Sequence, residues 1–303
     1  MFKQKGWKFF VVLMLVVLVV AGCNAGQPPV TEPADTEPEA MDPEETMEET
    51  PMETMMYADG LYYATGKYSE QSGWKSAVLL EVSGGKITQA NWTGISNKSG
   101  PDKKEASMGG MYPMVENGGA QAPWHEQAKK AEDHLLMTQD PKDIVFSDDE
   151  GHTDAISGVS INVNDFFTLA EAALEAGPQQ PGPYKDGYYM AEADDFANGW
   201  KGQVKVTVLF GRLESIQWTG VNEEGLDKIT ASMEGKYPMV ENGGAQAPWH
   251  DQSMKVTDHV TMNQDPMPVA YIDDEGHTDA ITGVSVHVND FYDLLEKALM
   301  DAK

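Results

Sequence analysis

The chain has 303 residues, a formal net charge of −28 at pH 7 and a single cysteine. This length accommodates two ordinary domains with additional segments. The strong negative charge excludes nucleic acid as a partner, because the phosphate backbone would repel the protein. One cysteine cannot build a disulfide framework, a Cys-x-x-Cys-His haem attachment or an iron–sulfur cluster. Any redox chemistry therefore requires an organic cofactor.

The N-terminus has the pattern of a secretory signal. Lysines precede an apolar run over residues 9–20, which is shorter than the roughly 20 residues of a comfortable membrane span. The run ends in Val-Ala-Gly-Cys at 20–23, which resembles the bacterial lipobox. We therefore predict a lipoprotein signal peptide over 1–22, lipidation of Cys23 and a position on the extracytoplasmic face of the cell membrane. An uncleaved anchor is the alternative.

Two segments have the composition of linkers. Residues 24–56 contain ten Asp and Glu side chains and no Lys or Arg. Such a segment cannot bury a core, so we predict that the lipidated segment 23–56 is a disordered acidic tether. Residues 177–183 (Gly-Pro-Gln-Gln-Pro-Gly-Pro) predict a short, stiff second linker.

The remainder of the chain is duplicated with a period of about 125 residues. The segment 112–125 is identical to 237–250, and 148–156 is identical to 273–281. A period of this length indicates duplicated domains rather than a solenoid. We predict one domain over 57–176 and a second over 184–303, and we call these segments the first and second repeat.

Each repeat is expected to begin with a β-meander. In the second repeat Val204, Val206 and Val208 alternate with polar residues, as in a half-buried strand. Three strands are predicted in the first repeat: 61–68, 74–82 and 87–95.

Helices and short strands are expected to follow the meander. A helix over 124–137 places Trp124, Ala128, Ala131 and Leu135 on one buried face, and Trp249, Ser253, Val256 and Val260 take the matching places. A short strand at 144–146 and another through Val163 precede a closing helix over 166–175. We predict that Asn164 or Asp165 caps this helix, as Asn289 or Asp290 does in the second repeat. The fold class is α+β, a mainly antiparallel sheet with packed helices.

A hydroxyl-bearing loop is the most faithfully repeated short segment. Apolar residues alternate with Ser160 and Asn162 over 159–163, so a strand here would point Ser160 away from the core. Gly158, two residues earlier, permits close approach of a bulky group to the backbone. Serine hydrolase chemistry is not expected, since no Gly-x-Ser-x-Gly elbow surrounds Ser160.

The two loops resemble a known modification motif. Residues 154–160 read Asp-Ala-Ile-Ser-Gly-Val-Ser, and residues 279–285 read Asp-Ala-Ile-Thr-Gly-Val-Ser. Both resemble the Asp-x-x-(Ser/Thr)-Gly-Ala-(Thr/Ser) motif of the FMN-binding domain family, which includes the C subunit of sodium-pumping NADH:quinone reductase and the G subunit of the Rnf complex. They depart from it by a valine before the acceptor and a serine as the acceptor.

The resemblance implies two tandem FMN-binding domains and two covalently bound FMN groups. A flavin transferase would esterify Ser160 and Ser285 with the phosphate of FMN. The motif residues that would support the acceptors are Asp154, Ser157, Gly158, Asp279, Thr282 and Gly283. Aromatic side chains that could face the flavin rings, although most are expected in the core, are Trp74, Trp92, Tyr112 and Trp124, matched by Trp200, Trp218, Tyr237 and Trp249.

The functional expectation is a membrane-anchored extracellular electron carrier rather than a conventional enzyme. It would take electrons from a membrane quinol or NADH dehydrogenase and pass them to acceptors such as ferric iron or free flavins. The alternative is a surface binding or adhesion lipoprotein without flavin, whose excised signal fragment could act as a peptide signal. No metal is expected, because the repeated histidines fit no zinc or EF-hand spacing and are predicted to be solvated or hydrogen-bonded: His125, His134 and His152, with His250, His259 and His277.

Overall fold

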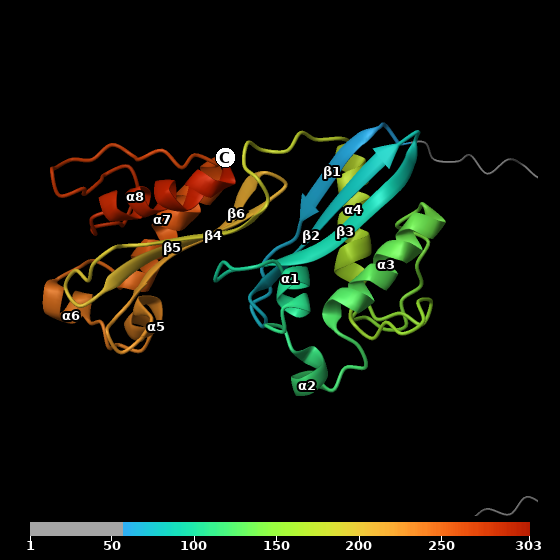
Figure 1. Ribbon diagram of the computed structural model, residues 1–303, viewed down its shortest axis with the longest axis horizontal. Coiled ribbons are helices and arrows are strands. Elements are labelled where there is room, and N and C mark those ends of the chain that lie inside the picture. The colour runs from blue at the N-terminus through green and yellow to red at the C-terminus, as the bar shows by residue number, and fades with distance from the viewer. Residues whose placement is uncertain (1–56) are drawn as a thin grey trace, which may run out of the picture. The chain divides into compact units, whose positions relative to one another are not determined.

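The structure is a computed structural model that describes residues 57–303 (Figure 1). The predicted signal peptide over 1–22, the tether over 23–56 and the lipidation of Cys23 lie outside the described residues. Within the described part of the chain, none of the helices combines the length and the apolar character needed to cross a bilayer.

The first repeat opens with the predicted antiparallel meander. Its strands are β1 (Gly60–Thr65), β2 (Trp74–Ser83) and β3 (Lys86–Ser96), paired in the order β1-β2-β3. Gly84 and Gly85, both at positive φ, form the two-residue turn between β2 and β3. Val78, Leu80 and Val82 alternate along β2 and are buried, so one face of the sheet covers the core.

Four helices follow this sheet: α1 (Lys103–Met108), α2 (Met114–Gly118), α3 (Trp124–Thr138) and α4 (Asn164–Ala176). Helix α3 packs on β3, and α4 packs on β1 and β2. The predicted apolar face of α3 is confirmed, because Trp124, Ala128, Ala131 and Leu135 are all buried.

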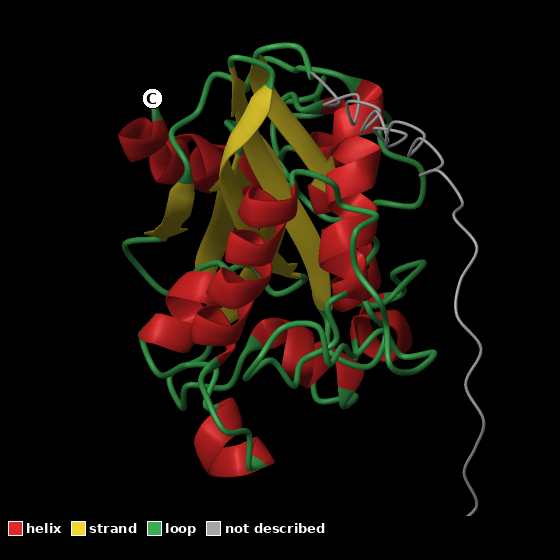
Figure 2. Cartoon of the chain, turned by 90° about the vertical axis from the view of Figure 1, so that its right-hand side faces the viewer, coloured by secondary structure: helices red, strands yellow, loops and turns green. Residues whose placement is uncertain are grey.

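The second repeat has the same element order. Its elements are β4 (Gly187–Glu192), β5 (Lys201–Leu209), β6 (Arg212–Val221), α5 (Lys228–Met233), α6 (Met239–Gly243), α7 (Trp249–Asn263), α8 (Asn289–Leu299) and a final 3₁₀ turn (Met300–Ala302). Strands β4, β5 and β6 form an antiparallel sheet, on which α7 and α8 pack. The described residues thus have an α+β fold with two three-stranded antiparallel sheets (Figure 2).

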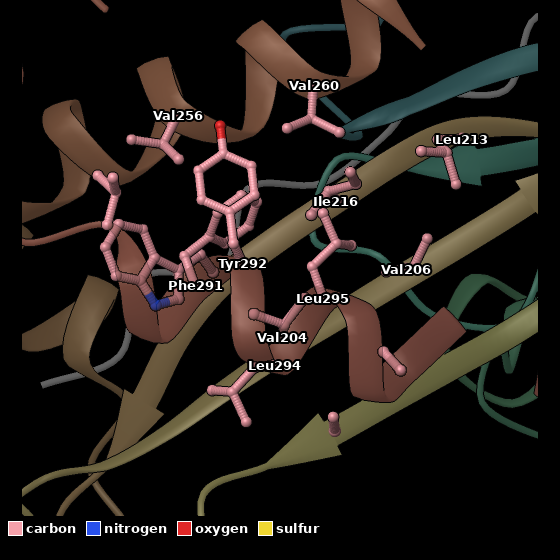
Figure 3. Close-up of a cluster of buried hydrophobic side chains, with 14 of the residues drawn as sticks. Val204, Val206, Leu213, Ile216, Val256, Val260, Phe291, Tyr292, Leu294 and Leu295 are labelled. Carbon is pink, nitrogen blue, oxygen red and sulfur yellow. The ribbon is translucent and has the colours of Figure 1, made fainter. Parts of the chain in front are cut away.

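The core of the second repeat lies between this sheet and α7 and α8 (Figure 3). The predicted burial of Val204, Val206 and Val208 is confirmed. Phe291 and Tyr292 of α8 are also buried, and burial raises the pKa of the Tyr292 phenol to about 12. Full burial of each large apolar side chain contributes about 1.5–3 kcal/mol.

Two strand predictions are wrong. Residues 144–146 and 159–163 have no strand conformation and belong to an irregular stretch that joins α3 to α4. Short apolar runs become strands only when a partner supplies a hydrogen-bond ladder, and these runs are instead held by side-chain and turn contacts. Val145, in the middle of the predicted strand over 144–146, is 75% exposed.

The predicted helix caps are also wrong. Helices α4 and α8 begin at Asn164 and Asn289, with Val163 and Val288 in the cap positions and no side-chain cap bond. The side chain that meets the start of α4 lies earlier than predicted: Asn162 Oδ1 accepts the backbone N–H of Asn164 at 3.0 Å.

The predicted linker over 177–183 is partly ordered against the first sheet. The backbone N–H of Gln179 donates to the Leu61 carbonyl at 2.7 Å, and the two residues form an isolated antiparallel bridge. The Gln179 side-chain amide also donates to the Tyr63 carbonyl at 2.8 Å. The segment therefore pairs with β1 through a single residue.

Candidate functional site

The repeated loop contains a tight turn that needs its glycine. The backbone N–H of Val159 donates to the Ile156 carbonyl at 3.3 Å, which closes a four-residue turn, and Gly158 has φ +73°. This third turn position requires positive φ, which glycine adopts without steric cost. In the second repeat Val284 bonds to Ile281 in the same way, with the intervening glycine at φ +76°.

The turn buries its apolar residues and displays its hydroxyl groups. Ile156 and Val159 are 8% and 9% exposed and join the core of the first repeat, whereas Ser160 is exposed. Ile281 and Val284 do the same in the second repeat, where Ser285 is exposed. The valine that departs from the family motif is therefore accommodated by packing. The exposure predicted for Ser160 is right, although the predicted strand is absent.

A buried glutamine fixes each acceptor serine. Oε1 of Gln127, in α3, accepts the Ser160 backbone N–H at 2.7 Å and the Ser160 hydroxyl at 3.2 Å. Gln252, in α7, accepts the same two groups of Ser285 at 2.6 and 3.3 Å. Each glutamine also donates to a backbone carbonyl before its helix, at 2.8 and 2.7 Å. The serine position is thus set by a helix that precedes it by about 33 residues.

Replacement of this glutamine should destabilise the second repeat. Gln252→Ala leaves the Ser285 N–H and the Ala247 carbonyl without their protein partner, so the free energy of unfolding should fall by about 2–3 kcal/mol. Urea denaturation of the full chain measures this change. The matched control is Met254→Ala, which changes an exposed side chain two residues along the same helix and should cost less than about 0.5 kcal/mol. Equal losses in both variants would contradict the assigned role.

A buried threonine holds the other end of the loop. The Thr153 hydroxyl donates to the Val145 carbonyl at 2.7 Å and accepts the Ala155 N–H at 3.1 Å. The Thr278 hydroxyl makes the equivalent bonds to Ala270 and Ala280, at 2.7 and 3.1 Å. Side-chain hydrogen bonds therefore replace a ladder in this part of the fold.

In the second repeat Ser285, the predicted acceptor, borders a cavity of about 820 Å³. This volume lies within the roughly 300–1,000 Å³ of small-molecule sites. Four of the lining residues are the predicted aromatic set of this repeat: Trp200, Trp218, Tyr237 and Trp249. The structure therefore places Ser285 and these aromatic side chains around one cavity.

A lysine lies among the aromatic rings of this cavity. Lys228 Nζ is 3.7 Å from the ring centroid of Trp249 and 4.8 Å from that of Tyr237. Burial lowers the pKa of Lys228 to about 8, and the negative charge of Asp290 opposes this shift. The ammonium group is stabilised by the π-faces of the rings. It places one positive charge in a cavity whose lining also includes Asp195, Asp290 and Asp293.

The first repeat has the same arrangement. Lys103 Nζ lies 4.7 Å from the centroid of Tyr112 and 5.0 Å from that of Trp124. Burial lowers the pKa of Lys103 to about 8, against the opposing charge of Asp165. The lysine and its aromatic surroundings are thus common to both repeats.

The aromatic residues divide into core and cavity-facing members. Trp92, Trp124, Trp218 and Trp249 are buried, so half of the eight predicted aromatic residues are core residues, and the other four are partly exposed. Trp249 also lines the cavity, and its indole N–H has no hydrogen-bond partner among the described residues. An unpartnered donor beside a cavity fits an acceptor atom of a bound ligand.

The other motif residues lie on the surface of the loop. The side chains of Asp154, Ser157, Asp279 and Thr282 are exposed. They are close in sequence to the acceptors, but they do not line the cavity of the second repeat. Their positions on the outer side of the loop are accessible to another protein.

The predicted hydrogen bonding of the histidines is confirmed at five positions, which include His152 and His277 with their Asp148 and Asp273 partners. His125 Nδ1 lies 2.9 Å from the Ser107 hydroxyl, and His250 Nδ1 lies 2.9 Å from that of Ser232. His134 Nε2 is 2.9 Å from the Asp143 carbonyl oxygen.

Three pairs of residues were missed by the sequence reasoning. They are Gln127 with Gln252, Lys103 with Lys228, and Lys130 with Lys255. The last pair bonds the glycine carbonyls of the two turns, at 3.1 and 3.4 Å. All three pairs recur at the repeat spacing outside the long identical blocks, and this recurrence is the signal that could have identified them.

No protein-family model and no curated protein matches the chain. A solution NMR structure of a protein from Clostridium thermocellum is 52% identical over 39% of this chain and 90% of that chain, with a TM-score of 0.33. A crystal structure of a protein from Clostridium perfringens is 25% identical over 40% of this chain and 89% of that chain, with a TM-score of 0.32. Neither description names an activity, ligand or partner.

Proposed function

We propose that this chain is a membrane-anchored extracellular electron-transfer flavoprotein that carries two covalent FMN groups, one on Ser160 and one on Ser285. The two repeats would be tandem FMN-binding domains. The proposal rests on the motif resemblance and on one observation above all. The exposed side chain of Ser285 borders a cavity with aromatic walls and a half-buried lysine.

The site suits a flavin in three respects. Aromatic side chains offer faces and edges against which a planar ring can pack. The positive charge of Lys228 favours a ligand that is or becomes anionic. The tight turn leaves the serine hydroxyl outside the core, where a modifying enzyme can reach it. When bound, the flavin supplies the redox chemistry, and the protein holds and shields it.

Attachment requires an activated flavin donor and a flavin transferase. A bond forms between Ser Oγ and the phosphorus of FMN, a phosphoanhydride bond to a nucleotide leaving group breaks, and the serine proton is released. The ester keeps the flavin in place at any dilution, whereas a dissociable cofactor is lost when the free concentration is low. This retention is valuable for a protein outside the cell.

The predicted N-terminal segments complete the proposal. A lipid on Cys23 would hold the protein at the membrane, and the acidic tether over 23–56 would extend the repeats away from it. The electron donor would be a membrane quinol or an NADH dehydrogenase, and the acceptors would be ferric iron or free flavins. The protein would act as a carrier between them.

Intact mass spectrometry tests the attachment directly. The full chain is produced with and without a flavin transferase, denatured and weighed. We expect the co-produced chain to be heavier by two FMN groups and to retain flavin absorbance after denaturation. A known substrate domain of the transferase, treated in parallel, verifies that the enzyme is active. An unmodified, colourless chain beside a modified control would instead favour the surface binding or adhesion lipoprotein.

A further inference from the structure

A cluster of metal-ligating side chains lies in the second repeat, beside the acceptor loop. Glu275, His277 and His287 each offer one ligand atom, and the three atoms lie within 4.8 Å of one another. The rings of His277 and His287 are 4.2 Å apart between centroids. Glu275 and His287 are exposed and His277 is half-buried, so an ion can reach the cluster from solvent. The sequence pattern predicted no metal, and His287 lies outside the set of repeated histidines.

Both histidines already have partners on one nitrogen. His277 Nδ1 lies 2.6 Å from Asp273 Oδ2, and His287 Nδ1 lies 2.9 Å from the Glu275 carbonyl oxygen. These oxygens only accept, so each Nδ1 carries the proton and each Nε2 has a free lone pair. A carboxylate or carbonyl on the other ring nitrogen is the usual outer support of a metal-bound histidine. In the neutral rings these contacts leave Nε2 as the nitrogen that can bind a metal ion.

The first repeat provides an internal comparison. Glu150, His152 and Asp148 match the acidic and histidine members of the cluster, and His152 Nδ1 lies 2.7 Å from Asp148 Oδ2. The position that matches His287 is Asn162. Its amide oxygen accepts the Asn164 N–H at 3.0 Å. The two repeats thus differ at the third donor.

We propose that Glu275, His277 and His287 form a binding site for one divalent transition-metal ion, and that the first repeat lacks this site. Two imidazoles and a carboxylate suit Zn²⁺ and its borderline neighbours. Three protein ligands leave a further position open to water or another molecule. Tetrahedral binding would draw the donor atoms to about 3.3 Å from one another, a small movement for exposed side chains. This site does not depend on the bound flavin.

The proposed metal site lies next to the cavity of the second repeat. His287 lines the cavity of the second repeat and follows Ser285 by two residues. A cation there would lie at the rim of the cavity, where its charge acts on any anionic ligand inside. The aromatic clusters around Lys103 and Lys228 would then differ in electrostatic potential although their aromatic residues are the same.

Zinc binding to the full, flavin-free chain tests the site. Isothermal titration with Zn²⁺ compares the wild type with His287→Asn, which installs the residue of the first repeat, and with Asn162→His, which installs the third donor in the first repeat. We expect His287→Asn to lose one bound ion or to bind it at least tenfold more weakly. We expect Asn162→His to gain one ion. Cys23 and the acidic tether are common to all three chains, so their background binding cancels.

NMR of the histidine side chains distinguishes coordination of Zn²⁺ by these residues from nonspecific electrostatic binding to the acidic chain. Zn²⁺ should shift the imidazole NMR signals of His277 and His287, whereas those of His152 should stay unchanged in the wild type. Glu275→Gln replaces His287→Asn as the test if the latter does not fold. The proposal is overturned if the wild type binds Zn²⁺ no better than the ligand variant, or if Asn162→His gains no ion.

Discussion

A chain with both Ser160→Ala and Ser285→Ala should lose all flavin on denaturation, whereas either single variant should retain about half of the wild-type flavin. The reason is chemical: alanine has no oxygen to form the ester. The two acceptors lie in separate repeats with separate glutamine contacts, so each should be modified independently. Flavin absorbance of the denatured, desalted protein, divided by protein concentration, measures the expected steps.

The matched control keeps the hydroxyl group. Ser160→Thr combined with Ser285→Thr retains both acceptors and installs the residue that is commoner in the family. This chain should therefore keep two flavins. Flavin that survives in the double alanine variant would show attachment elsewhere, and loss of both flavins from one single variant would show that modification of the two loops is coupled.

The unfolding free energy of the flavin-free chain should rise between about pH 7 and pH 9.5, by roughly 2 kcal/mol for each buried lysine. Lys103 and Lys228 have pKa values of about 8 in the folded state, against 10.5 for the unfolded reference. Below pH 8 both states bind the proton, so the cost of burying the charge is present in full. Above pH 8 the folded state releases the proton first, and the cost diminishes. Urea denaturation at the two pH values measures the rise.

Methionine substitutions assign this pH dependence to its source. Lys228→Met should remove about half of the rise, and Lys103→Met with Lys228→Met should remove nearly all of it. Lys236→Met, at an exposed lysine, should leave it unchanged. Tyrosines with raised pKa values lower the stability only above about pH 10, so the measurement ends below that range. A rise that persists in the double variant would exclude these two lysines as its cause.

The regular elements could be predicted from local patterns. The alternation of Val204, Val206 and Val208 identifies a strand because one face of the sheet is buried. The spacing of Trp124, Ala128, Ala131 and Leu135 identifies a helix for the same reason. In each case the pattern reflects burial against the core of that repeat.

The irregular stretch before α4 could not be predicted in this way. Its apolar residues, such as Ile156 and Val159, are buried singly, and their spacing resembles that of a strand. What holds them is a turn, a threonine hydroxyl and a glutamine that lies far away in the sequence. The glutamine contact depends on how α3 packs against the loop, and a prediction from a few neighbouring residues cannot include a helix about 33 residues away.

The candidate site was predictable only in part. The acceptor serines came from the motif resemblance, and the aromatic walls from their recurrence in both copies. The position of Lys228 over Trp249 was not predictable, because α5 and α7 meet only in the folded protein. The residues next to Lys228 in the sequence are both polar and apolar, so they do not indicate that its ammonium group will be partly buried.

Ser160 and Ser285 lie in loops without strand-to-strand hydrogen bonds, and this affects how a flavin transferase could reach their hydroxyl groups. Two buried apolar side chains, one turn and a few side-chain hydrogen bonds from a glutamine, a threonine and a lysine hold each loop in place. A segment fastened so sparsely can detach locally at a fraction of the global unfolding free energy. A transferase could therefore bind the detached loop as an extended peptide while the sheet and helices stay folded. The loop would return to its place after the flavin is attached.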